Sequence, residues 1–177
     1  MLAITELLKF LFDAYIMIIL ARVWMQFVRA DFYNPLSQFV VKATQAVVGP
    51  LRRFIPAIGK LDTASLLFAY LVMVLKLIVL TSIFGQGGLP IVPILVFSLQ
   101  ALLVQFLWLI FYVLIVRAIL SFVSQGNNPM EIVLMQLTEP FLAPVRRIIP
   151  PIGGLDFSVL VVILALQFVI RLVEHGF

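Results

Sequence analysis

Cysteine is absent from the 177-residue sequence, and histidine occurs once, as His175. The absence of cysteine excludes disulfides, thiolate catalysis and cysteine-ligated metals. A lone histidine near the carboxyl end is more often a tail residue than a ligand. The sequence also lacks a glycine-rich phosphate loop, a G-x-S-x-G elbow and metal-binding histidine–glutamate spacing. We therefore expect a non-enzymatic protein with no catalytic residue, cofactor or metal.

Charge is also scarce, since 11% of the residues are charged and 64% are hydrophobic. A soluble domain carries about 25% charged residues. The mean hydropathy is +1.21, and long apolar runs match the ~20 residues that cross a bilayer core as a helix. The net charge of +4 does not indicate a nucleic-acid partner, because no basic run exceeds two residues. The composition predicts an all-α membrane protein in contact with the lipid bilayer.

Four apolar stretches predict four transmembrane helices, at about residues 10–28, 63–84, 93–123 and 157–173. The first stretch does not resemble a signal peptide, because Asp13 interrupts it and its flank carries both Glu6 and Lys9. The segment "GQGGLP", residues 85–90, predicts a turn between the second and third spans.

One basic, proline-containing motif occurs twice. "GPLRRFIPAIGKLD" (Gly49–Asp62) recurs as "APVRRIIPPIGGLD" (Ala143–Asp156), with nine of fourteen positions identical at a shift of 94 residues (49 to 143). The same shift places Thr44 on Thr138. Such self-similarity indicates a tandem duplication, with repeats over 1–88 and 89–177. Each repeat holds two spans, so both enter the membrane from one side, as parallel repeats related by an axis along the membrane normal.

A short helix is predicted between the two spans of each repeat, at about 35–48 and 129–142. Asn34 and Asn128 are favourable N-caps, and a proline follows each at the first helical position. Apolar residues at helical spacing form one face: Leu36, Phe39, Val40, Ala43 and Val47, then Met130, Val133, Leu134, Leu137 and Phe141. The opposite face carries Ser37, Lys42, Thr44, Gln45, Glu131 and Gln136. These amphipathic helices lie in the membrane interface, or alternatively pack as cytosolic helices on the other repeat.

The repeated motif follows each short helix. Its prolines predict the end of that helix, its glycine a turn, and Asp62 and Asp156 the caps of the next spans. Each copy carries an arginine pair: Arg52 and Arg53, then Arg146 and Arg147. By the positive-inside rule these segments are cytoplasmic and both termini periplasmic. The arginines either set orientation alone, or also recognise anionic phospholipid headgroups or a partner.

Five charged residues lie inside the predicted spans: Asp13, Arg22, Lys76, Arg117 and Arg171, which stands in the place of Lys76 in the second repeat. Charge inside a membrane costs at least ~2.5–3.5 kcal/mol at mid-bilayer. Arg22 and Arg117 either extend to the interface or pair with Asp62 and Asp156. Asp13 and Lys76 lie at similar depth on neighbouring antiparallel helices, so we predict that their charged atoms approach within about 4 Å.

The chain resembles the YggT family of bacterial integral membrane proteins, which is related to YlmG of Gram-positive bacteria and to plastid homologues. The resemblance rests on residues 20–45, "GPLRRFIP" (Gly49–Pro56), residues 122–140 and "PVRRIIPPIGGLDFS" (Pro144–Ser158). It implies a multi-pass protein of the bacterial inner membrane without an established biochemical activity. The family is linked to osmotic-shock tolerance and potassium uptake, its Gram-positive relatives to cell division, and its plastid relatives to cytochrome b6 haem attachment and to nucleoid or thylakoid organisation. It supplies no catalytic residues.

Two classes of function follow. The first is a non-enzymatic scaffold, assembly or stress-tolerance factor that presents both arginine pairs at the cytoplasmic face. The second is a small transporter or channel subunit in ion homeostasis, active as an oligomer because four spans leave little room for a pore. Sparse polarity within the spans favours the first. A membrane-protein partner or a homo-oligomer is compatible with both.

Overall fold

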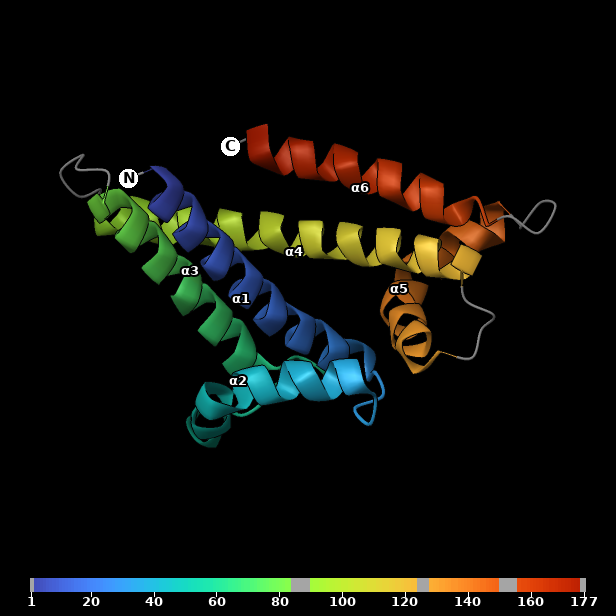
Figure 1. The fold of residues 1–177 in the computed structure, drawn as a ribbon, viewed down its shortest axis with the longest axis horizontal. Helices are drawn as coiled ribbons and strands as arrows, with labels where there is room; N and C mark the ends of the chain where they lie inside the picture. The colour runs from blue at the N-terminus through green and yellow to red at the C-terminus, as the bar shows by residue number, and fades with distance from the viewer. Residues whose placement is uncertain (1, 84–89, 124–127, 150–155, 176–177) are drawn as a thin grey trace.

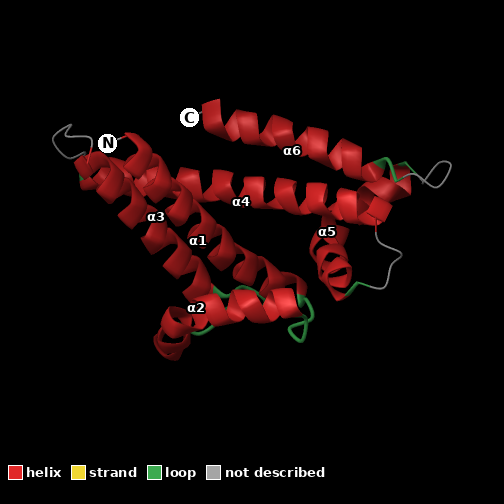
Figure 2. Ribbon diagram, viewed as in Figure 1, coloured by secondary structure: helices red, strands yellow, loops and turns green. Residues whose placement is uncertain are grey.

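The computed structural model describes residues 2–83, 90–123, 128–149 and 156–175, and these form helices and connecting segments (Figures 1 and 2). The helices are α1 (Leu2–Val28), α2 (Pro35–Phe54), α3 (Thr63–Ile83), α4 (Ile91–Val123), α5 (Pro129–Ile148) and α6 (Ser158–His175). The expected turn at 85–90 lies almost entirely outside the described residues, as do residues 150–155 of the second motif copy.

Among the described residues, three helices are long and apolar enough to cross a membrane: α3, α4 over Ile91–Leu120, and α6. The remaining long helix, α1, has 27 residues and carries Asp13 and Arg22. It begins at Leu2 rather than near residue 10. Helix α4 begins at Ile91 and includes Pro93 in its first turn, where an N–H has no intrahelical partner and its loss costs little.

The helices form two pairs, each crossed by a short helix at one end (Figure 1). Helices α1 and α3 run antiparallel, with α2 across their lower end, while α4 and α6 run antiparallel, with α5 near the end of α4. Helix α1 begins and α6 ends on the side of the molecule remote from α2 and α5. One hydrophobic core joins both pairs, with Ile16 and Ile19 of α1, Met73 of α3 and Leu114 of α4 fully or almost fully buried.

Both short helices are longer than predicted. Helix α2 continues through Pro50 to Phe54, and α5 continues through its internal prolines to Ile148. The expectation that the prolines end these helices is therefore wrong for Pro50 and Pro144, because a proline removes one N–H and bends a helix without necessarily stopping it. It holds for Pro56, since α2 ends at Phe54, before the residue that precedes this proline. Both arginine pairs consequently lie in a last helical turn rather than in loops, where cations favour the negative helix end.

The predicted apolar face of α2 is not the face that packs on the protein. The buried residues are Ser37, Val40, Thr44 and Val48, whereas Phe39 and Val47 of the predicted apolar face are 55% and 40% exposed. The sequence had left open whether the apolar face meets lipid or the other repeat. In the structure, polar side chains face α1 because a buried arginine there needs hydrogen-bond acceptors.

In α5 the predicted apolar face is partly buried. Val133, Leu134 and Leu137 of that face are buried, together with Thr138 and Leu142. Met130 and Phe141 are instead exposed.

The first copy of the repeated motif ends in a tight turn. Gly59 has a φ of 62°, in the left-handed region that favours glycine. Ile58 and Leu61 exchange backbone hydrogen bonds of 3.1 and 3.0 Å across it. The turn brings Asp62 back beside the end of α2, where it meets Arg52.

Candidate functional site

Polar side chains gather where each short helix meets its two long helices. The first Arg–Asp cluster consists of Arg22, Thr44, Gln45, Arg52 and Asp62. The second Arg–Asp cluster consists of Arg117, Thr138, Glu139, Arg146 and Asp156. The two sets occupy positions related by a shift of 94 residues, or 95 for the first arginine of each (22 to 117).

Arg22 lies at the centre of the first cluster and is only 3% exposed. Its Nη1 donates to Thr44 Oγ1 at 2.7 Å, and its Nη2 donates to Gln45 Oε1 at 2.8 Å. Its Nε lies 3.7 Å from Asp62 Oδ2. A guanidinium removed from water needs partners for its donors, and α2 supplies most of them here. The predicted pairing with Asp62 is therefore present, and extension of Arg22 to the interface is not needed.

Asp62 is fully buried and receives bonds from two directions. Arg52 donates to both carboxylate oxygens, with 3.3 Å between its Nε and Oδ1. The backbone N–H of Ser65 donates to Oδ1 at 3.3 Å, and the Ser65 hydroxyl donates to Oδ2. Asp62 thus caps α3 and holds the end of α2 at once.

The ionised form of Asp62 is favoured by this environment. Burial opposes ionisation, but the hydrogen bonds from Arg52 and Ser65 outweigh it and hold the pKa of the carboxyl below its usual value. Arg52 Nη2 also donates to Gln26 Oε1 at 2.5 Å. The end of α1, the end of α2 and the start of α3 are therefore fastened together through one arginine.

The second cluster repeats this arrangement with a different carboxylate. Arg117 donates to the Thr138 hydroxyl, as Arg22 does to Thr44, but its ion pair is with Glu139, at 3.8 Å. The predicted pairing of Arg117 with Asp156 is not among the ion pairs of the described residues. Glu139 takes that role because it stands one residue after the threonine, in the position that Gln45 occupies in the first cluster.

Arg146 connects both acids of the second cluster. Its Nη1 donates to the two oxygens of Glu139, each at 3.1 Å, and its Nη2 lies 2.7 Å from Asp156 Oδ2. Asp156 accepts from the backbone N–H of Ser158 at 3.0 Å and so caps α6. Burial opposes ionisation of Asp156, but the hydrogen bonds from Ser158 and Arg146 outweigh it and lower its pKa. Burial also disfavours charge on Arg146, yet its bonds to Asp156 and Glu139 raise its pKa.

The two arginines of each pair have different surroundings. Arg52 and Arg146 are engaged in the clusters, whereas Arg53 and Arg147 are exposed and have no hydrogen bond or ion pair to any described residue. The caps of the short helices are also in place: the side chains of Asn34 and Asn128 accept from the N–H groups of Leu36 and Met130, at 2.9 and 3.0 Å.

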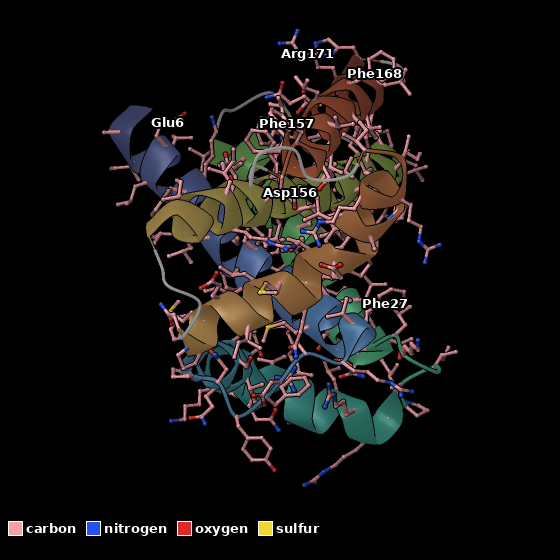
Figure 3. All side chains as sticks on the ribbon, turned by 90° about the vertical axis from the view of Figure 1, so that its right-hand side faces the viewer. Glu6, Phe27, Asp156, Phe157, Phe168 and Arg171 are labelled. Carbon is pink, nitrogen blue, oxygen red and sulfur yellow. The ribbon has the colours of Figure 1, made fainter. Side chains whose placement is uncertain are left out.

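The expected intramembrane ion pair is present between α1 and α3. Lys76 Nζ lies 2.5 Å from Asp13 Oδ1, and Gln105 of α4 donates to the backbone carbonyl of Asp13 at 2.8 Å. The pair lines a cavity of about 610 Å³, together with Trp108 and Glu174. Trp108 Nε1 donates to Glu174 Oε1 at 3.2 Å. Arg171, which the sequence aligns with Lys76, points outward from α6 (Figure 3).

Comparisons with known proteins assign the chain to a family. The sequence model of the CCB3/YggT family matches residues 1–83 and 96–176. The chain belongs to the CCB3/YggT family. It is 55% identical over 163 residues to an uncharacterized protein from the proC 3' region of Vibrio alginolyticus, covering 92% of this chain and 88% of that protein.

Two further relatives agree with this assignment. The uncharacterized protein YggT of Escherichia coli K12 is 49% identical over 166 residues, covering 94% of this chain and 86% of its own. An uncharacterized protein of Pseudomonas aeruginosa is 43% identical over 172 residues, with 96% and 87% covered. No solved structure matches the chain. The family confirms the resemblance found in the sequence, while the names of these relatives assign no activity.

Sequence reasoning missed the acceptors of the buried arginines. Thr44, Gln45, Thr138 and Glu139 were placed on a solvent face or left unassigned, and Gln26 was not considered. One signal was available, because Thr44 and Thr138 coincide at the 94-residue shift. A threonine preserved between two copies that otherwise differ on that face indicates a shared contact. Among the described residues, no group of three His, Cys, Asp or Glu side chains could hold a metal.

Proposed function

We propose that the protein is a non-enzymatic inner-membrane scaffold, or stress-tolerance factor, that presents two fixed cationic helix ends at the cytoplasmic face. The observation that carries the proposal is the difference in contacts between the two arginines of each pair. Arg52 and Arg146 fasten the short helices to the long ones. Arg53 and Arg147 are exposed and have no partner among the described residues, which leaves them accessible to an anionic group. A rigid support with one free guanidinium per copy suits recognition of phosphate or carboxylate groups.

The proposed topology has four spans, with α1 as the fourth, and periplasmic termini. Basic residues between the spans gather on and after the short helices, which favours a cytoplasmic position for that end. The beginning of α1 and the end of α6 lie at the other end of the molecule (Figure 1). Reporter fusions after Phe177 and between Gly85 and Gly88 should both report the periplasm, and a cytoplasmic signal at either place would refute this orientation.

Two parallel repeats account for the placement of both clusters on one side. The family model matches two segments of similar length, and the same kinds of contact recur at positions shifted by 94 residues. We therefore expect residues 5–84 to superpose on 100–173 in an experimental structure, with both repeats crossing the membrane in the same direction.

An interfacial position of α2 is supported by its outward apolar side chains. Phe39 and Val47 point away from the protein and the polar acceptors point toward it. A helix with water on that side would gain nothing from exposing Phe39. In the interface this ring is buried among lipid chains.

The test of the scaffold proposal removes the free guanidinium groups and leaves the fastening ones. The double variant Arg53→Gln/Arg147→Gln should insert and fold normally, yet should fail to restore osmotic-shock survival in a strain lacking its own copy. A matched comparison is Arg53→Gln against Lys42→Gln, which removes the same charge from an exposed position of the same helix. Full complementation by the correctly inserted double variant would refute recognition by these arginines.

The second candidate, a transporter or channel subunit, is favoured by one observation. The Asp13–Lys76 pair lines a cavity among apolar helices, and charge in such a place is a functional feature by default. The double variant Asp13→Asn/Lys76→Met removes both charges without leaving either one unpaired. Loss of osmotic tolerance and of ion flux in a folded double variant would favour transport, whereas full complementation would favour the scaffold.

A further inference from the structure

A cavity of about 680 Å³ is lined by residues of α1, α3, α4, α5 and α6 and by Leu61. None of its lining residues belongs to either cluster or to the Asp13–Lys76 pair, although Gln100 also lines the cavity of that pair. The lining of this larger cavity is aliphatic, aromatic or proline apart from Gln100, whose amide donates to the carbonyl of Val173 at 2.8 Å. A cavity of this size holds one small ligand, and such a lining selects hydrocarbon.

The cavity is elongated. Val96, Leu99, Leu103 and Phe106 line it along one face of α4, over about 15 Å at 1.5 Å per residue. Such a length can hold an extended stretch of an acyl chain. Val96, Leu99 and Leu103 are 63%, 64% and 49% exposed, so this groove opens sideways from the protein.

The groove has a cationic rim. Phe27 and Val28 line it at the end of α1, and Leu61 lines it just before α3; Figure 3 shows Phe27 at the outer edge of the molecule. Arg29 directly follows Val28, and Lys60 directly precedes Leu61; both are exposed. Two acids lie near the groove. Asp31 accepts from the N–H of Tyr33, and Glu139, which precedes the lining residue Pro140, is paired with Arg117 and Arg146.

The first cluster adds to the positive charge of this rim. It contains two arginines and one aspartate, because Gln45 replaces the glutamate of the second cluster. Arg52 belongs to this cluster and reaches the rim through Gln26, the neighbour of Phe27.

We propose that the groove binds one acyl chain of an anionic phospholipid of the cytoplasmic leaflet, with its phosphate at the rim formed by Arg29, Lys60 and Arg52. The proposal rests on the membrane orientation given under the proposed function, but not on Arg53 or Arg147. Charge complementarity at the rim and an elongated apolar lining together select a lipid with a negative headgroup.

The experiment measures lipid binding to the purified full-length protein in mild detergent, by native mass spectrometry. The probes are phosphatidylglycerol and phosphatidylcholine with identical chains. We expect phosphatidylglycerol to bind at least tenfold more tightly. The variant Arg29→Gln/Lys60→Gln should reduce this preference by about fivefold per removed cation. The control variant Lys42→Gln removes an exposed cation outside the rim and should preserve the preference.

A second set of variants tests the groove itself. Leu103→Trp should weaken binding of both lipids at least tenfold, because the indole fills the space for the chain. Val96→Trp provides an independent filling variant if Leu103→Trp does not fold. The control Leu164→Trp changes an equally exposed leucine of α6 outside the groove and should leave binding unchanged.

Three outcomes would overturn the proposal. Equal binding of the two lipids would exclude recognition of the headgroup. Unchanged lipid binding in a folded Leu103→Trp or Val96→Trp variant would exclude the groove as the binding site. A wild-type dimer that a groove variant converts to monomer, with lipid binding unchanged, would assign the groove to a second copy. Failure of complementation by Arg53→Gln/Arg147→Gln bears on the proposed function alone, because those arginines lie outside the rim.

Discussion

The two Arg–Asp clusters perform the same mechanical task with different charges. In the first, two arginines share one fully buried aspartate, and a neutral glutamine completes the acceptors of Arg22. In the second, two arginines face two carboxylates, and the cluster is partly exposed. The conserved elements are a threonine, an arginine in the last turn of a short helix and an aspartate cap. The geometry therefore depends on hydrogen bonding, whereas the net charge is free to differ.

The largest expected difference between the clusters is at the aspartates. Asp62→Asn should lower the free energy of unfolding by about 3–5 kcal/mol, because it leaves the buried Arg22 without a carboxylate. Asp156→Asn should cost less than half of this, since Arg146 keeps Glu139. Unfolding of both variants in detergent measures the difference. Equal losses would show that the second acid of the second cluster does not compensate.

Substitution of the two threonines should cause the second-largest loss of stability. Thr44→Val removes the acceptor of a buried guanidinium donor and should destabilise by about 1.5–3 kcal/mol. Thr138→Val should behave alike, because the same contact recurs there. Thr81→Val is the matched control, since the Thr81 hydroxyl bonds only to carbonyls of its own helix. A control effect as large as that of Thr44→Val would contradict the role of the arginine contact.

Exchange of Gln45 and Glu139, which occupy the same position in the two clusters, should have a smaller effect on stability. Glu139→Gln removes a half-exposed acid and should destabilise by about 0.5–1 kcal/mol, and Gln45→Glu should stabilise the first cluster by a similar amount. The double exchange should therefore leave stability near the wild-type value. Effects of the same sign in the two single variants would show that the clusters are not equivalent environments.

The pH dependence should be the smallest effect near neutrality. Both aspartates have lowered pKa values in the folded state, so their stabilisation is complete above the unfolded value of about 3.9 and is lost as pH falls through the folded values. The contribution of the two aspartates to stability should therefore be constant between pH 7 and 5 and should decline below about pH 4. The stability of Asp62→Asn should fall less steeply below about pH 4 than that of the wild type. An unchanged steepness would contradict a contribution of the Asp62 carboxylate to the acid decline.

The sequence predicted those parts of the site that follow from local rules. Asn34 and Asn128 are recognisable as N-caps from their residue type and from the proline that follows each of them. Asp13 and Lys76 were predicted to pair because antiparallel helices of known direction place them at equal depth. These inferences need only helix geometry and the high cost of unpaired charge in hydrocarbon.

The remainder depended on tertiary contacts. Thr44 looked like part of a polar solvent face, because an amphipathic pattern does not say whether a buried arginine will face it. The prolines of α2 and α5 looked like helix ends, because the sequence does not reveal that Asp62 and Asp156 fold back to hold Arg52 and Arg146 in the last turn. Arg117 was expected to meet an aspartate, whereas the alignment of Gln45 with Glu139 indicated a nearer acid.

The central claim is that one arginine of each pair fastens the fold while the other is free. The most direct test is the free energy of unfolding of four single variants in the same detergent: Arg52→Gln, Arg146→Gln, Arg53→Gln and Arg147→Gln. The first two should each lose more than 1 kcal/mol, because each removes the guanidinium hydrogen bonds to the buried or half-buried carboxylates of its cluster. The last two should stay within about 0.5 kcal/mol of the wild type, as surface substitutions do. Equal losses within either pair would contradict the account.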